Sequence, residues 1–526
     1  MNNPIISNGV NDHLQKTILA VKNKKQFVFK EGGAKVKINE SVGRAAFYYE
    51  KLRNTIDYQD EHLFLKNAIK RILKRHAYLA SRGIGLALLK ELVWAKYFEN
   101  ETVPAILAEE IESILRKYNF FREKATFNIS ATALTDLIAG FAACEIEELL
   151  SPASDKEEFL LFCKQIISKN IHLDNEDPFS VDIQSEIAIR KYIIKEDREQ
   201  IRFKLISRYY QDWPKVKKTE GEVFAKSFAG YYQMAEQQLK TSKKSKISKY
   251  IKRNSPPFSV VYELIYKGTD NLERNLKNQD SFSALIRSEI NRRRDQTRSR
   301  VLKAVVRGII FILLTKIILA FLIEIPYEQQ VLGQINYASL ITNITFPPFL
   351  MLLIGLLIKV PGRKNTEELT RLVSSVVFEE KLISKPLITS FSAPSRKYLV
   401  FNVIYSVMSV GVLVGVIYLL ILLKFNIASI VLFYIFVSLV SFLGFRIRAI
   451  AKELEVRPED DTMISGVYNF ILLPFVVIGK FLSERWSEYN ITLIFWDFVI
   501  EAPFKALIGL FEAWLSFSRE KREEFE

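Results

Sequence analysis

The stretch Tyr398–Leu423, YLVFNVIYSVMSVGVLVGVIYLLILL, contains 26 residues and not one charged side chain. After the short turn at Lys424, Phe425–Phe445 (FNIASIVLFYIFVSLVSFLGF) adds 21 more uncharged residues. A hydrocarbon core about 30 Å thick is crossed by roughly 20 apolar residues in a helix. Each stretch is therefore long enough to span a bilayer. Together they predict a tight transmembrane hairpin with spans at about 398–423 and 426–445.

Two further apolar stretches precede this hairpin, at about 305–323 and 338–358. Residues 1–300 are rich in charged side chains instead, and their apolar residues recur at the helical period, as in Ala131–Leu150 and Ile183–Tyr210. The sequence therefore predicts an all-α protein in three parts. These are a large helical domain over 1–300, a four-span region over 301–450 with a loop at 359–397, and a C-terminal amphipathic helical hairpin with a charged tail over 451–526.

The distribution of basic residues predicts the orientation in the membrane, because Lys and Arg accumulate in cytoplasmic loops. Eight Lys and Arg residues between Arg287 and Arg307 precede the first span, whereas Glu324–Tyr337 contains none. The 359–397 loop holds eight basic and four acidic residues, and basic residues also follow the fourth span. We therefore expect a multi-pass protein of the cell membrane whose N-terminal domain, 359–397 loop and C-terminal tail are cytoplasmic.

The N-terminus has neither a basic region nor an apolar core of the kind that a signal peptide requires, so we expect the first span to target the chain. The two cysteines, Cys144 and Cys163, favour a reducing compartment over a disulfide framework. No two of the four histidines have metal-ligand spacing, and neither GxSxG nor a Walker A sequence occurs. The sequence thus indicates no metal, no cofactor and no recognisable catalytic motif.

Three features inside the expected spans are polar or break the helical pattern. Lys316 lies near the middle of the first span, where a charge is a functional candidate by default. It could also snorkel, or pair with an acidic group such as Asp497 or Glu501. Asn343 precedes Pro347–Pro348, and two adjacent prolines predict that the second span is kinked or broken.

The C-terminal segment carries a narrow polar stripe, because Asp497, Glu501 and Lys505 follow one another at intervals of four residues. A helix lying flat in the headgroup region shows this pattern, and so does a span whose charged face lines the interior of a bundle. The flat helix is favoured, because Pro503 interrupts the run and a central charge is costly in lipid. Met463–Gly479, with Pro474 inside, is left open as a short span, a re-entrant element or a second interfacial helix.

Gly411 and Gly415 form a GxxxG motif in the third span. Small residues at this spacing let helices approach closely. We expect packing against the fourth span, and the motif gives weak support for a homo-oligomer.

A basic run, KTSKKSKISKYIKR, lies just before the last helix of the N-terminal domain. Its seven cations are Lys240, Lys243, Lys244, Lys246, Lys249, Lys252 and Arg253. The plainest interpretation is a solvated linker or helix face. The alternative is contact with anionic lipid, which gains about 1 kcal/mol per cation near the surface. Nucleic acid is disfavoured, because Tyr250 is the only aromatic residue in the run and offers no stacking platform.

Two functional hypotheses follow from these observations. The first is a membrane-anchored interaction or scaffold protein that binds an unidentified protein partner through its N-terminal helical domain. The alternative is a transporter or channel component that uses the Pro347–Pro348 break, Lys316 and the acidic stripe of Asp497 and Glu501. A sealed helix bundle favours the first hypothesis, and a polar route to Lys316 favours the second.

Overall fold

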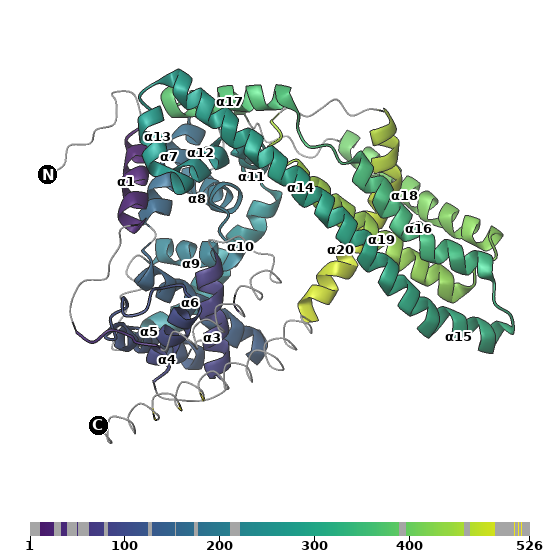
Figure 1. Ribbon diagram of the computed structural model, residues 1–526, viewed down its shortest axis with the longest axis horizontal. Coiled ribbons are helices and arrows are strands. Elements are labelled where there is room, and N and C mark those ends of the chain that lie inside the picture. The colour runs from purple at the N-terminus through teal and green to yellow at the C-terminus, as the bar shows by residue number, and fades with distance from the viewer. Residues whose placement is uncertain are drawn as a thin grey trace.

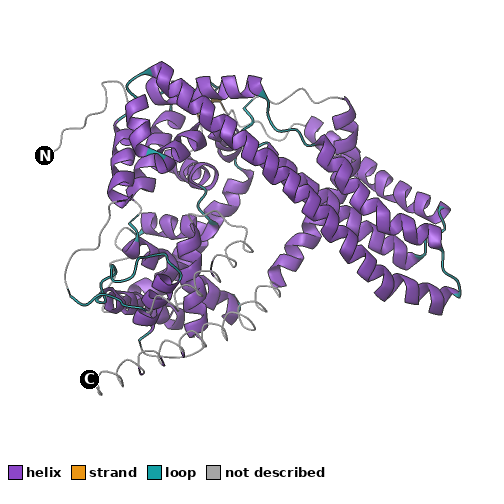
Figure 2. Cartoon of the chain, in the orientation of Figure 1, coloured by secondary structure: helices purple, strands orange, loops and turns teal. Residues whose placement is uncertain are grey.

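In the residues that it describes, the computed structural model is all-helical apart from two strands of two residues each (Figure 2). It describes residues 11–25, 33–38, 50, 63–77, 83–124, 129–152, 154–172, 177–210, 221–384, 386–388, 396–456, 463–489, 510, 514 and 517. Three separate hydrophobic cores organise these residues. The first is formed by helices of the charged N-terminal part, the second by N-terminal helices together with residues of the 359–397 loop, and the third by the apolar helices. Figure 1 shows how these helices are arranged.

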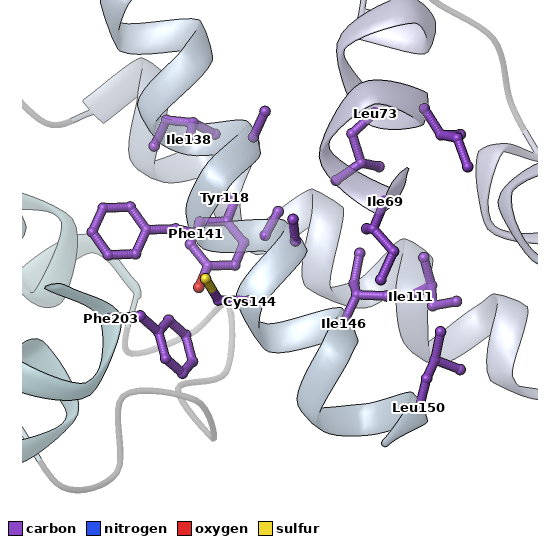
Figure 3. Close-up of a cluster of buried hydrophobic side chains, with 14 of the residues drawn as sticks. Ile69, Leu73, Ile111, Tyr118, Ile138, Phe141, Cys144, Ile146, Leu150 and Phe203 are labelled. Atoms are coloured by element: carbon purple, nitrogen blue, oxygen red, sulfur yellow. The ribbon is translucent and has the colours of Figure 1, made fainter. Parts of the chain in front are cut away.

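The first core belongs to what we call the outer unit. Its helices are α3 (Phe64–Ala77), α4 (Ile84–Trp94), α5 (Leu107–Lys124), α6 (Ala131–Leu150), α9 (Arg198–Tyr209) and α10 (Gly221–Lys244). Figure 3 shows side chains from several of these helices packed together, with Tyr118 of α5, Phe141 of α6 and Phe203 of α9 near one another. The expected helix Ala131–Leu150 has the same bounds in the structure, and Ser130 caps it by accepting a hydrogen bond from the amide of Ala133.

The second core belongs to the inner unit, from which the long helix α14 leaves toward the apolar bundle (Figure 1). Its N-terminal elements are α1 (Asp12–Lys25), α7 (Ser154–Ser168), α8 (Pro178–Ile189) and the π-helical turn η2 (Arg190–Ile194). They pack with α11 (Lys246–Arg253), α12 (Ser255–Lys267), α13 (Thr269–Asn275) and the start of α14 (Gln279–Leu319).

The inner unit also contains part of the 359–397 loop. Helix α17 (Arg363–Phe378) lies within that loop and buries Leu369, Val373 and Val376 in the inner core. Strand β2 (Leu387–Ile388) then pairs in parallel with β1 (Ile171–His172), and its register aligns Ile171 with Leu387. The described part of the loop between the second and third spans, as far as Ile388, is therefore part of the inner unit.

The third core holds together the apolar bundle. Among the described residues, four helices are long and apolar enough to cross a membrane, so the chain has the architecture of a multi-pass membrane protein. The first begins as α14 and continues without interruption through η4 (Ala320–Glu324), α15 (Ile325–Tyr327) and η5 (Glu328–Leu332). The others are α16 (Tyr337–Leu357), α18 (Arg396–Leu422) and α19 (Ile427–Ala451).

One expectation for the spans is wrong: Glu324–Tyr337 is not simply a connection, because the first helix continues through it as far as Leu332. The sequence also predicts a second span that is kinked or broken at Pro347–Pro348. The span is not broken, since α16 is helical on both sides of the two prolines and buries both rings, and the kink stays a prediction. Membrane helices tolerate proline where neighbouring groups satisfy the freed backbone.

Helix α20 (Met463–Tyr489) is a fifth member of the bundle. Gly479 lies so close to α19 that a Cβ atom there would be only 2.0 Å from the carbonyl oxygen of Ser438. Phe475 is buried in the third core, with its ring 5.5 Å from that of Tyr434. Because Ser438 is in the middle of α19, Phe475 and Gly479 lie beside the middle of the fourth span.

The segments that follow the second and fourth spans both contact the inner unit. Helix α17 follows the second span, and residues 452–456 follow the fourth. Asn365 of α17 donates to the carbonyl of Leu454 at 2.8 Å and accepts from the amide of Val456 at 2.9 Å. The segments after the second and fourth spans therefore lie on the same side of the bundle as the inner unit.

Candidate functional site

A buried polar cluster joins three helices of the bundle around Lys316. The Lys316 ammonium lies 3.1 Å from Oε1 of Glu324 and donates to Oδ1 of Asn343 at 2.8 Å. The amide of Asn343 donates to the same Glu324 oxygen at 2.8 Å. It also reaches the carbonyl of Ser429, in the first turn of α19, at 3.3 Å.

The π-helical turn η4 places Glu324 on the correct face. Eight residues of regular α-helix would rotate Glu324 by about 80° from Lys316. The π-helical turn Ala320–Glu324 adds a residue to the helical repeat, which turns Glu324 back toward Lys316. The sequence does not predict this pair, because a regular α-helix would turn Glu324 away from Lys316. The one available signal is that Glu324 is the acidic residue at the end of the apolar run that contains Lys316.

The cluster is closed to solvent. Lys316, Glu324 and Asn343 all have 0% relative exposure, and the Phe436 ring covers the ammonium at 4.8 Å. Within the described part of the chain, Oε2 of Glu324 and the Ser429 hydroxyl have no hydrogen-bond partner. The site thus combines a neutralised ion pair with two buried oxygen atoms that lack a hydrogen-bond partner among the described residues. No group of metal ligands occurs among the described residues.

A second buried carboxylate lies one turn further along the same helix. Glu328, 1% exposed, accepts from the side chain of Asn426 at 2.7 Å and from the amide of Asn336 at 2.9 Å. Asn336 and Asn426 are the N-caps of α16 and α19. Glu328 therefore links the end of the first span to the starts of the second and fourth.

The structure brings Lys316 and Asn343 together, but it gives Lys316 a different acidic partner from those considered in the sequence. Glu324 of the same helix takes the position proposed for Asp497 or Glu501. Asp497, Glu501 and Lys505 lie outside the described residues. The choice between a flat and a spanning C-terminal helix therefore stays a prediction.

The Gly411 and Gly415 motif does not pack against the fourth span. An added Cβ at either position would meet no described atom within 4 Å, and many of the surrounding α18 side chains are exposed. The expected contact within the chain is wrong, because α18 turns other residues, among them Leu413, toward α19. Self-association through this face stays a prediction.

The basic run forms two helices. Lys240 is exposed on α10, and Lys243 and Lys244 belong to the last turn of that helix. Helix α11 buries Ile247 and Ile251 in the inner core and exposes its four cations, Lys246, Lys249, Lys252 and Arg253. Helix α11 is thus an amphipathic helix on the surface of the inner unit, in agreement with the helix-face interpretation, and lipid contact stays a prediction.

Comparison of the chain with protein-family models, with curated proteins and with solved structures found no match.

Proposed function

We propose that this protein is a membrane-anchored interaction protein whose outer and inner units lie on the cytoplasmic side of the cell membrane. The observation that carries the proposal is the insertion of α17 into the inner core. Together with the continuous helix α14 and the 452–456 segment, it joins the inner unit to the bundle at three places. Such a joint holds a binding surface at a fixed position above the membrane.

The cytoplasmic orientation rests on charge. Arg298, Arg300 and Lys303 are exposed on α14, between the inner unit and the apolar part of the helix. The opposite end of the bundle has Glu328 and the neutral segment around Gln334. Basic residues on one side and their scarcity on the other support placing both units in the cytoplasm.

The alternative is a transporter or channel component. Transport requires a route by which a solute or ion reaches the polar groups inside the membrane. Among the described residues, Lys316, Glu324 and Asn343 have no exposed surface and are hydrogen-bonded to one another. This closure supports anchoring over transport.

Cysteine labelling in intact cells tests the orientation. Gln334→Cys and Lys364→Cys place single reactive thiols at exposed positions on opposite ends of the bundle, while native Cys144 and Cys163 are buried. An impermeant reagent should modify position 334 at once and position 364 only after permeabilisation. Labelling of position 364 in intact cells would contradict the cytoplasmic location of the inner unit.

Site-specific photocrosslinking tests the interaction role. Ile106, in the turn directly before α5, is 63% exposed and is a suitable position for a photoreactive residue on the outer unit. We expect one discrete adduct in the native membrane, and none from the charged position Glu109 in the first turn of α5. Reconstitution into vesicles tests the alternative function. Solute or ion flux through these vesicles that Lys316→Met abolishes would favour a transporter instead.

A further inference from the structure

Five exposed cations gather on one surface of the inner unit, where no described residue provides a carboxylate partner. They are Lys191 of η2 and Lys246, Lys249, Lys252 and Arg253 of α11, and we call them the basic face. Among the described residues, no carboxylate lies within ion-pair distance of any of them. Neighbouring cations differ: Arg190, Lys204 and Arg208 each pair with glutamates.

The fold builds this face from two separate segments. Lys246, Lys249 and Arg253 recur at intervals of three and four residues, so they share the side of α11 opposite Ile247 and Ile251. Tyr192 of η2 lies between the segments, with the Lys191 ammonium 5.0 Å and the Lys252 ammonium 5.8 Å from its ring centre. Partial burial alone would raise the pKa of Tyr192, but a hydrogen bond with Ser248 and the two ammonium groups lower it.

Two contacts place the basic face near the points where the chain enters and leaves the membrane. Lys195, directly after η2, forms an ion pair at 2.5 Å with Glu453, two residues beyond the end of α19. The Tyr250 hydroxyl of α11 lies 2.7 Å from that of Ser384, on the segment that leads toward α18. Figure 1 shows α11 on the side of the inner unit that faces α14 and the bundle.

We propose that the basic face docks on anionic phospholipid headgroups of the bilayer that the same chain spans. The inference rests on the proposed anchoring function and deepens it by naming the partner of this surface. Unpaired ammonium and guanidinium groups complement phosphate charge, and the anchored bundle keeps them beside the bilayer at high local concentration. Each cation that reaches an anionic surface is expected to strengthen the contact about fivefold.

The test uses the full-length protein in nanodiscs with a spin label at Ser245→Cys. Ser245 precedes α11 and its side chain makes no capping hydrogen bond, so the label leaves the basic face intact. Relaxation by a nickel-chelating lipid headgroup reports closeness to the membrane. We expect stronger relaxation in phosphatidylcholine–phosphatidylglycerol discs than in phosphatidylcholine alone, and a decrease as salt is raised.

The triple variant Lys246→Gln, Lys249→Gln, Lys252→Gln should reduce the relaxation to the level seen without anionic lipid. The matched control replaces Lys16, Lys124 and Lys277, which are exposed on other parts of the two units, and should change nothing. Equal relaxation in both lipids, an unaffected triple variant, or displacement of the label by added RNA would each overturn the proposal. Nanodiscs expose both membrane faces, so this result is independent of the orientation that cysteine labelling tests.

Discussion

Lys316 and Glu324, eight residues apart on one continuous helix, form an ion pair with an Nζ–Oε1 distance of 3.1 Å in which neither side chain has exposed surface. Asn343 bonds to both partners, so the second span is tied to the pair that the first span carries. A charge alone in lipid is expensive, whereas a neutralised pair with shared hydrogen bonds is tolerated. The cluster therefore makes the insertion of these two spans mutually dependent.

Removing one charge of the Lys316–Glu324 pair should destabilise the protein much more than removing both charges. Lys316→Met leaves the Glu324 carboxylate buried and uncompensated, and we expect it to destabilise the protein by about 3–5 kcal/mol. Adding Glu324→Gln should recover most of that loss, because the amide can still bond to Asn343. Thermal unfolding in detergent measures both variants. Equal destabilisation by the single and double changes would rule out a coupled pair.

Gly479 and Gly411 should respond in opposite ways to the same substitution. A Cβ at Gly479 would be 2.0 Å from the Ser438 carbonyl oxygen, so Gly479→Ala must push α20 away from α19 at a cost of about 1–3 kcal/mol. Gly411→Ala meets open space and serves as the matched control. The midpoint of thermal unfolding should fall only for the first variant. An unchanged Gly479→Ala midpoint would contradict the close approach.

Val373 of α17 should be essential for the inner unit. It is fully buried in the inner core, so Val373→Asp places an unpaired carboxylate among apolar side chains and should cost more than about 3 kcal/mol. Hydrogen exchange should then accelerate in α12 and α17 while the outer unit keeps its protection. Arg371→Ala, on the exposed side of the same helix, should leave exchange nearly unchanged. Uniform protection in both variants would show that α17 contributes little.

Glu157 should make the stability of the two units sensitive to acid. Burial alone would raise the pKa of Glu157, but Arg190 and Lys204 lower it to about 2 from an ordinary value of 4.5. A lowered pKa in the folded state stabilises the protein above pH 4.5, and this contribution is lost as the pH falls toward 2. Glu157→Gln should flatten the decline in denaturation midpoint over that range, whereas Glu123→Gln on the exposed face of α5 should not. Parallel wild-type and Glu157→Gln profiles would refute this role.

Local sequence signals predict much of the fold and little of its assembly. The four apolar helices and α6 follow directly from hydropathy and periodicity. The expected single helix Ile183–Tyr210 is interrupted, because Lys195 adopts a left-handed conformation at φ 65° and Asp197 starts a new helix. Asp197 and Gln200 form a capping box, which is a readable sequence signal for that start.

The candidate site was harder to predict because its parts depend on contacts between distant segments. Lys316 and Asn343 stand out in the sequence as polar residues in apolar runs. Glu324 does not, because regular helical phase would turn it elsewhere and it lies at the edge of the expected span. The burial of α17 and the approach of α20 to α19 likewise depend on tertiary packing, which no local pattern encodes.

The position of α17 in the inner core has a consequence for biosynthesis. The elements that this core needs are separated along the chain by the first two spans, so the ribosome delivers both spans to the membrane before it synthesises Leu369 and Val376. Until then the part of the inner core that α17 covers stays open. Completion of the inner unit is therefore a late, post-insertion step, and a nascent chain that fails to integrate its spans exposes that surface to chaperones and proteases.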